Sequence, residues 1–399
     1  MKPRRTASGV ATITVLTKPW KCSSECLYCP NDLRMPKSYL SDEPACQRAE
    51  RTFFDPYLQV AARLKALTEM GHITDKVELI ILGGTWSDYP LAYQIWFVRE
   101  LFRALNDGSK AQNNIAKRRT QYEHAGISSD VATLKKQVAP LQERIANQEL
   151  SYNQAFDLHY AISEAWGTVA TWQSATWEEL ETEHRTNETA HHRVVGLVIE
   201  TRPERITPHH AYTLRRLGCT KVQMGIQSLD EHIRKQNNRP TTNAQIQSAF
   251  ETLRLFGFKT HIHAMVNLLG ATPESDKQDY LHLVEGKPFQ PDEIKLYPCV
   301  LVDGTGLCAH YQDHTWKPYS EEELIEVLVA DTCATPAFTR ISRMIRDISA
   351  PDIVAGNKKV NLRQLVENRI DTEKLSTKEI RHREVSLADT DPSTLRFES

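Results

Sequence analysis

The sequence predicts an α/β fold in which six parallel strands and their helices form an open, partial TIM-like (β/α)6 barrel. From Ala11 onward, short β-branched runs alternate with amphipathic helical stretches. This alternation is typical of βα units around a parallel sheet. The 399 residues, 40% of them hydrophobic and 25% charged, provide enough apolar content for such a core. We therefore expect the chemistry to lie at the carboxyl ends of the strands.

Each expected element follows from its local pattern. The strands are apolar runs at residues 11–17, 77–82, 194–200, 221–225, 260–266 and 294–297. The helices have apolar residues at helical spacing and span residues 56–70, 91–105, 209–217, 244–256 and 321–331. We expect residues 1–108 and 191–335 to form the two parts of the barrel, and residues 336–385 to form a basic C-terminal extension. The stretch from Ser386 to Ser399 has no periodicity and is expected to be a loose tail.

Residues 109–190 interrupt the alternation and predict a helical insertion between the second and third strands. Its apolar residues from Val131 to Ile145 follow helical spacing, so we expect part of it to form an amphipathic helix that is kinked or interrupted at Pro140. For the insertion we expect a helical hairpin. The insertion has eight basic and eleven acidic residues, which favours packing or partner contact over RNA binding.

Cys22, Cys26 and Cys29 form a CxxxCxxC motif directly after the first strand. Three thiolates on one loop can hold three irons of a 4Fe–4S cluster, whereas a structural zinc normally takes four protein ligands. The fourth iron is then open to a small chelating cofactor, as radical S-adenosylmethionine (SAM) chemistry requires. A partial zinc site is the alternative, but the sequence has no second CxxC pair to complete it.

Glycines and polar residues follow the next three strands. A Gly-Gly turn exposes main-chain donors and acceptors, and a neighbouring carboxylate and guanidinium suit the ammonium and carboxylate of a methionyl group. An amide and a hydroxyl suit a ribose. For the Gly-Gly turn, the alternative is only a tight strand exit. For the carboxylate and guanidinium it is an internal ion pair, and for the amide and hydroxyl it is a turn. We expect the SAM-binding residues to be Gly83, Gly84, Thr85, Glu200, Arg202, Gln227 and Ser228.

Two pairs of side chains share a face on the last predicted strands. His261 and His263 alternate along the fifth strand and are either core residues or catalytic groups. Lys295 and Tyr297 alternate along the sixth, where a lysine among apolar neighbours needs a partner or a ligand. We therefore expect this face of the sixth strand to be functional.

The charge is unevenly distributed, although the formal net charge is only −2. Residues 1–21 contain five Lys or Arg and no acid, and residues 340–383 contain eleven Lys or Arg against six Asp or Glu. Such patches can contact a phosphate backbone, but many are only solvated. The apolar runs are far shorter than the roughly 20 residues of a membrane span. With cysteines that lack a disulfide framework, this predicts a cytoplasmic protein.

Together these motifs resemble the catalytic subunit of Elongator and its bacterial and archaeal relatives, which make 5-carboxymethyluridine at the tRNA wobble position. The resemblance is carried by five short motifs in the family's order, namely GGT at 83–85, ETRP at 200–203, KLYP at 295–298, RDI at 346–348 and REV at 383–385. Only the insertion and the tail fall outside it.

The resemblance implies that a 5′-deoxyadenosyl radical, formed from SAM at the cluster, takes hydrogen from the acetyl methyl of acetyl-CoA. The carbon radical then adds to C5 of uridine 34. By position, Cys22, Cys26 and Cys29 would bind the cluster, while Lys295 and Tyr297 would be the catalytic residues that face the radical and the acetyl group. The residues similarly placed for the tRNA anticodon stem-loop are Arg340, Arg343, Arg346, Lys358, Lys359 and Arg363.

The family normally continues beyond the REV motif into an acetyltransferase domain, whereas this sequence ends at Ser399. We therefore expect the acetyl donor, acetyl-CoA, to be bound by a separate acetyltransferase-domain protein or through loosened specificity. The expected electron donor is a protein of the flavodoxin or ferredoxin type. Two alternatives are a radical SAM enzyme with a different substrate and a non-catalytic RNA-binding or assembly subunit. The intact cysteine motif argues against the second.

Overall fold

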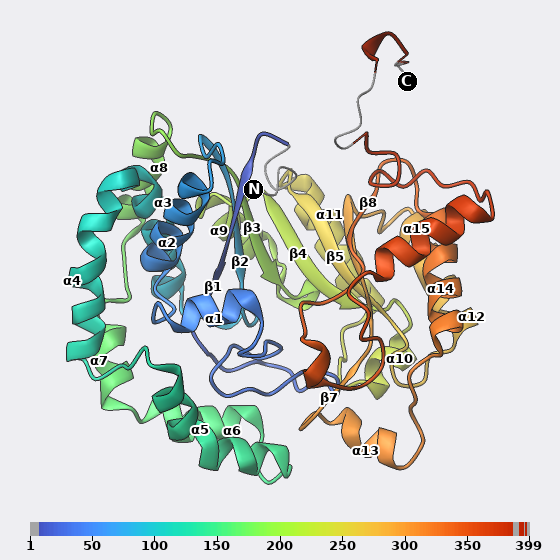
Figure 1. The fold of residues 1–399 in the computed structure, drawn as a ribbon, viewed down its shortest axis with the longest axis horizontal. Coiled ribbons are helices and arrows are strands. Elements are labelled where there is room, and N and C mark those ends of the chain that lie inside the picture. Colours follow the sequence, from blue (N-terminus) through green and yellow to red (C-terminus); the bar gives the residue numbers. More distant parts are fainter. Residues whose placement is uncertain (1–7, 386–390, 395, 397–399) are drawn as a thin grey trace.

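The computed structural model describes residues 8–385, 391–394 and 396, and its main sheet has seven parallel strands. The strand order is β1-β2-β3-β4-β5-β6-β8. The strands span Ala11–Leu16 (β1), Lys76–Leu82 (β2), Arg193–Thr201 (β3), Lys221–Gln227 (β4), Lys259–Val266 (β5), Glu293–Pro298 (β6) and Arg340–Arg343 (β8). The sheet curves through the molecule as an open half-barrel with helices on its outer side (Figure 1). The predicted α/β barrel class is confirmed.

The expected number of six strands is wrong, because β8 adds a seventh strand beside β6. The other six strands are those predicted, with ends displaced by at most two residues. β8 has the sequence Arg-Ile-Ser-Arg, and only Ile341 is fully buried. A short edge strand has one neighbour and needs little apolar surface, so it leaves no hydrophobic alternation in the sequence.

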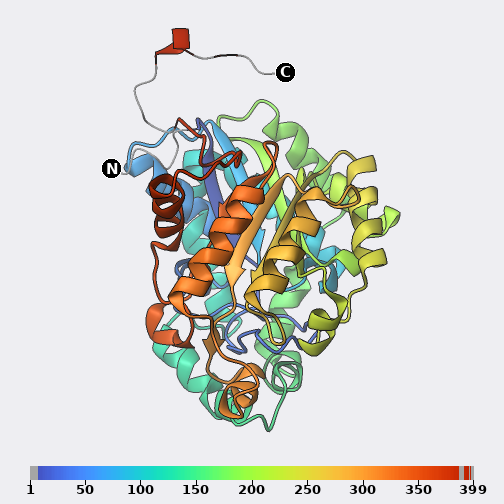
Figure 2. The ribbon, with the colours of Figure 1, turned by 90° about the vertical axis from the view of Figure 1, so that its right-hand side faces the viewer.

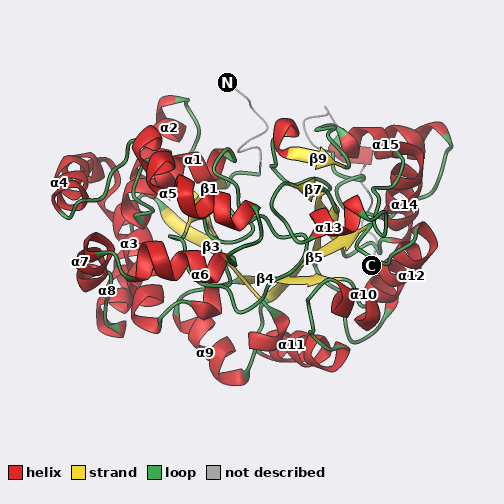
Figure 3. Ribbon diagram, turned by 90° about the horizontal axis from the view of Figure 1, so that it is seen from below, coloured by secondary structure: helices red, strands yellow, loops and turns green. Residues whose placement is uncertain are grey.

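Ten α-helices of the described chain lie outside the insertion, and most of them cover the outer face of the sheet. They span Pro44–Glu50 (α1), Pro56–Glu69 (α2), Leu91–Asp107 (α3), Pro208–Arg216 (α9), Glu231–Gln236 (α10), Asn243–Leu255 (α11), Pro273–Glu285 (α12), Leu307–Gln312 (α13), Glu321–Ala334 (α14) and Leu362–Thr372 (α15). Helices α12 and α14 lie side by side over the last strands (Figure 2). Figure 3, seen from below, has these helices around the central strands. Buried apolar residues of strands and helices form one large core between them.

The insertion consists of five helices, so the expected helical hairpin is wrong. They span Ala111–His124 (α4), Val131–Ala146 (α5), Tyr152–Phe156 (α6), Glu164–Trp172 (α7) and Trp177–Asn187 (α8). Four side chains, Asp130, Ser151, Ser163 and Thr176, each accept a backbone N–H at the start of the next helix. These N-caps divide the segment. Helix α5 continues through Pro140 without interruption.

The C-terminal extension joins the barrel at two places. β8 pairs with β6, and a small antiparallel sheet pairs β7 (Leu301–Val302) with β9 (Ile353–Ala355). The predicted tail from Ser386 lies mostly outside the described residues, and Pro392–Thr394 within it forms a 3-10 turn. The predicted domain boundaries stay a prediction. No helix in the described part of the chain has both the length and the apolar content that a membrane crossing needs.

Asp331 of α14 gives a prediction about stability. It is 1% exposed, and neither carboxylate oxygen has a hydrogen-bond partner. Burial, together with the nearby Asp276 and Asp279, raises the pKa of Asp331 well above its usual range. A carboxyl group whose pKa is raised by folding costs stability as pH rises from about 4 toward that folded pKa. We therefore expect Asp331→Asn to unfold at a higher temperature than wild type at pH 8, with a smaller difference at pH 5.

The measurement is thermal unfolding at both pH values. Asp303→Asn is the control, since Asp303 is exposed and its replacement should change neither unfolding temperature. An Asp331→Asn protein that is no more stable than wild type at pH 8 would contradict the explanation.

Candidate active site

The largest concentration of predicted site residues lines one cavity of about 160 Å³ at the carboxyl ends of the strands. The cysteine loop forms one wall, the ends of β2 to β6 form the floor, and the segment after β8 forms the opposite wall. Predicted residues that line it are Cys22, Cys26, Cys29, Gly83, Gly84, Thr85, Glu200, Arg202, Gln227, Lys295, Tyr297, Arg343 and Arg346. Residues from distant parts of the sequence are therefore brought to one place by the parallel sheet.

All three motif cysteines are free thiols, and Cys26 is buried. A hydrogen bond from Cys29 and the guanidinium of Arg239, whose Nη1 lies 3.8 Å from Cys26 Sγ, hold the pKa of Cys26 well below its usual value. A thiolate is the form that binds iron. Arg239 therefore places positive charge beside Cys26, one of the predicted cluster ligands.

The cavity also contains buried polar atoms without a partner in the described structure. They are Tyr28 Oη, Arg202 Nε and Nη1, Gln227 Oε1 and Arg239 Nε. Unpaired buried polar groups are costly and mark places where a ligand completes the hydrogen bonding. This donor and acceptor set, next to three thiols, fits the predicted cluster and SAM.

Among the described residues, no three His, Cys, Asp or Glu side chains are arranged around a single metal ion.

The turn after β2 brings main chain to the cavity wall. Gly83 has φ 148°, and a Cβ there would lie 1.8 Å from Thr17 Oγ1. The Thr17 hydroxyl is itself fixed by a 2.8 Å hydrogen bond with Tyr89 Oη. Only glycine fits this close approach between β1 and β2. A Cβ on Gly84 would meet nothing closer than 3.6 Å. Thr85 Oγ1 lies 3.9 Å from Cys22 Sγ.

A chain of side chains crosses the cavity floor from β3 to β6. Tyr39 donates to Glu200 at 3.4 Å, and His263 Nδ1 lies 3.5 Å from Glu200. Gln223 Oε1 is 3.0 Å from His263 Nε2 and accepts from Lys295 Nζ at 2.7 Å. Burial raises the pKa of Glu200 and, with the nearby Lys295, lowers that of His263. The cavity floor thus contains a continuous network of polar contacts among side chains that are largely removed from solvent.

Lys295 and Tyr297 both point into the cavity, as their alternation on β6 predicts. Burial lowers the pKa of Lys295 to about 8, although Glu200 partly offsets this effect. Burial also raises the pKa of the Tyr297 hydroxyl. An amine that titrates near neutral pH beside a neutral phenol can hold or release a proton.

The six residues predicted to bind RNA divide into two groups. Arg343 and Arg346 line the cavity, and Arg346 donates to the backbone oxygen and hydroxyl of Ser38. The other four lie outside this cavity: Arg340 pairs with Glu384, Lys359 with Glu321 and Arg363 with Glu367, while Lys358 is exposed. Ser228 also lies outside it, where its hydroxyl accepts the backbone N–H of Asp230.

Sequence reasoning missed several residues of the site. Arg239 and Gln223 were not among the predicted site residues, although both contact predicted ones. Arg239 is 213 positions from Cys26, and Gln223 lies 72 positions from Lys295. The only sequence signal for Gln223 is a polar residue inside an apolar strand, which the need to pair buried polar groups could have identified.

The close approach at Gly83 predicts a contrast between two neighbouring glycines. Gly83→Ala should lose about 2 kcal/mol or more of unfolding free energy, since the new methyl overlaps Thr17 in a backbone conformation that suits glycine. Gly84→Ala, the matched control, should lose much less because its Cβ would lie 3.6 Å from Tyr89 Oη, which is an ordinary contact distance. Chemical denaturation measures both, and equal losses would contradict the packing argument.

Parts of the chain match two protein-family models, and nearly the whole chain aligns with curated proteins. The model of the radical SAM superfamily matches residues 169–282, and that of the radical SAM C-terminal domain matches residues 291–372. The tRNA uridine(34) acetyltransferase of Methanocaldococcus infernus is 33% identical over 390 residues, which cover 96% of this chain and 60% of that protein. Elongator complex protein 3 of Bos taurus is 30% identical over 397 residues, which cover 97% of this chain and 60% of that protein.

Among solved structures, the archaeal Elp3 of Methanocaldococcus infernus with an N-terminal deletion is similar, with a TM-score of 0.67 and 29% identity. The match covers 94% of this chain and 65% of that one. The chain thus spans about 60% of the length of the two curated relatives. Two segments of the chain thus match radical SAM models, and its resemblance to the Elongator catalytic subunit family is confirmed.

Proposed function

We propose that the protein is a radical SAM enzyme that modifies wobble uridine 34 of tRNA and takes part in making 5-carboxymethyluridine from acetyl-CoA. The observation that carries the proposal is the convergence of the cysteine loop, the strand-end polar groups and Lys295 on one cavity. The names of the relatives, tRNA uridine(34) acetyltransferase and Elongator complex protein 3, support the choice of substrate.

The match to the radical SAM superfamily model implies a 4Fe–4S cluster and SAM. When bound, these groups supply a 5′-deoxyadenosyl radical that can abstract hydrogen from an unactivated carbon. We assign Cys22, Cys26 and Cys29 to the cluster. We assign Gly83, Gly84, Thr85, Glu200, Arg202 and Gln227 to SAM, because they line the cavity together and because the carboxylate, guanidinium and amide among them match its polar atoms.

Lys295 and Tyr297 are proposed to orient the acetyl group. In the protonated form, Lys295 can donate a hydrogen bond to a thioester carbonyl, and Tyr297 remains a neutral donor across the physiological range. Tyr297 is buried and Lys295 is half-buried, and reduced contact with solvent strengthens such hydrogen bonds relative to water.

We propose that Arg343 and Arg346 contact RNA phosphate at the cavity wall, and that Arg340, Lys358, Lys359 and Arg363 extend this contact over the anticodon stem-loop. We propose that acetyl-CoA is bound by a separate partner protein that has an acetyltransferase domain. A flavodoxin or ferredoxin type protein is the proposed electron donor, and the reducing cytoplasm is the proposed location.

The test is anaerobic reconstitution followed by incubation with SAM and a reductant. Wild type should cleave SAM to 5′-deoxyadenosine, and Cys26→Ala should not, because one cluster ligand is lost. Cys333→Ala is the control, since this partly exposed cysteine lies on α14 outside the cavity. In cells that lack the gene, mass spectrometry should find less 5-carboxymethyl modification at uridine 34. A loaded cluster without SAM cleavage, or unchanged wobble nucleosides, would contradict the proposal.

The titration of Lys295 predicts a pH dependence for the complete modification reaction. Because its pKa is lowered to about 8, the ammonium form is lost as pH rises through 8, and the rate should fall there. Lys295→Arg keeps a positive charge at higher pH, so its residual activity should lack this decline. Rates measured from pH 6.5 to 9.5 for both proteins provide the comparison. If Lys295→Arg shows the same fall in rate above pH 8 as wild type, a group other than Lys295 causes the fall.

A further inference from the structure

The loop that carries the three cysteines has no regular structure of its own. Residues 17–43, all within the described range, contain turns but neither helix nor strand. Helices α5 and α6 of the insertion lie directly beside this loop at the lower edge of the barrel (Figures 1 and 3). The conformation of the loop is therefore set largely by what it packs against.

Asn153 of α6 holds the peptide groups of the first cysteine. The backbone N–H of Cys22 donates to Asn153 Oδ1 at 3.0 Å, and Asn153 Nδ2 donates to the carbonyl oxygen of Cys22 at 2.8 Å. One side-chain amide thus satisfies both backbone groups of a metal-binding candidate. Such a pair of hydrogen bonds fixes the backbone of Cys22 and hence the direction of its side chain.

A second amide repeats this arrangement after the motif. The backbone N–H of Leu33 donates to Gln142 Oε1 at 2.9 Å, and Gln142 Nε2 donates to the carbonyl oxygen of Asn31 at 3.1 Å. Tyr152 adds a buried hydrogen bond from its hydroxyl to the carbonyl oxygen of Met35, at 2.7 Å. The loop is therefore held by the insertion on both sides of the three cysteines.

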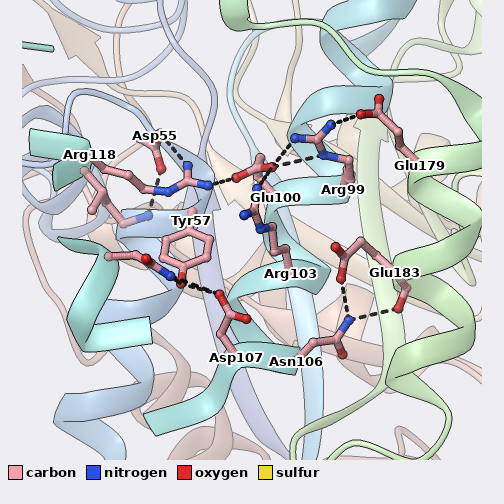
Figure 4. Close-up of polar contacts among 12 residues, drawn as sticks. Asp55, Tyr57, Arg99, Glu100, Arg103, Asn106, Asp107, Arg118, Glu179 and Glu183 are labelled. Carbon is pink, nitrogen blue, oxygen red and sulfur yellow. Dashed lines mark hydrogen bonds and ion pairs between the residues drawn. The ribbon is translucent and has the colours of Figure 1, made fainter. Parts of the chain in front are cut away.

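The same insertion is fixed to the barrel at its other helices by a network of ion pairs (Figure 4). Arg118 of α4 contacts Asp55 and Glu100, which are 2% and 1% exposed. Glu179 of α8 pairs with Arg99 at 2.9 Å. Buried charges must be paired, so separating these helices from the barrel would be costly. These ion pairs therefore hold helices α4 and α8 against the barrel, and α5 and α6, which contact the cysteine loop, lie between them in the sequence.

We propose that the insertion is a brace that presets the cysteine loop before a cluster binds, with Asn153 and Gln142 as positioning residues. The proposal rests on the proposed function only in assigning the cluster to this loop. Without Asn153, the backbone groups of Cys22 must find water, and the loop samples more conformations. The brace thus slows the loss of iron, because release needs the loop to open.

The first test uses the full chain without a cluster. Amide hydrogen exchange of residues 18–36 should become roughly tenfold faster at Cys22 in Asn153→Ala, and at Leu33 in Gln142→Ala, since each variant removes a pair of hydrogen bonds. Asn147→Ala is the control on the same insertion, because Asn147 contacts only the exposed side chain of Glu149 through its amide. It should leave both amides unchanged.

The second test uses the reconstituted protein. Iron release to a chelator should be several-fold faster in Asn153→Ala than in wild type or Asn147→Ala, and the electron paramagnetic resonance (EPR) signal of the reduced cluster should broaden. Unchanged exchange and unchanged iron release in Asn153→Ala and Gln142→Ala would overturn the brace. If exchange rises throughout the insertion in Asn153→Ala, that variant has lost its fold locally and does not test the brace. The exchange rate of the Leu33 amide in Gln142→Ala then decides whether the insertion holds the loop. A wild type that assembles no cluster contradicts the proposed function, and the exchange experiment still decides the brace.

Discussion

The parallel register of the main sheet is the constraint on which the site depends. Parallel strands direct all their carboxyl ends to one edge, and β2 to β6 each deliver a glycine or a polar side chain there. The cysteine loop leaves β1 at that same edge. A shift of one residue in any strand would turn its polar side chain to the opposite face. The packing of the apolar core therefore fixes the register of the strands, and the register determines which polar side chains face the cavity.

Burying so many charged groups in one cavity carries a cost that the fold only partly offsets. Glu200, His263, Gln223 and Lys295 satisfy one another, but Arg202 and Arg239 retain nitrogen atoms without a partner. Such incomplete satisfaction is uncommon in a core and is found at sites adapted to a ligand. The proposed SAM site explains this imbalance, because a charged, polar ligand would supply the missing partners.

Local sequence signals predicted much of the fold and site, because they concern residues that act near where they stand. The strands were visible from apolar runs, and the GGT and ETRP motifs from their position after those runs. The strand β8 was missed because only Ile341 is fully buried there. The contact between Asn153 and Cys22, 131 positions apart, depends on how the insertion folds back on the barrel. No local pattern encodes such a contact.

We propose that the cavity places SAM against a cluster held by Cys22, Cys26 and Cys29. The EPR spectrum of the reduced, reconstituted protein, recorded before and after addition of SAM, tests it most directly. We expect the cluster signal to shift when SAM is added, because the cofactor would bind the iron that has no cysteine ligand. An intact cluster signal that SAM leaves unchanged would contradict the account.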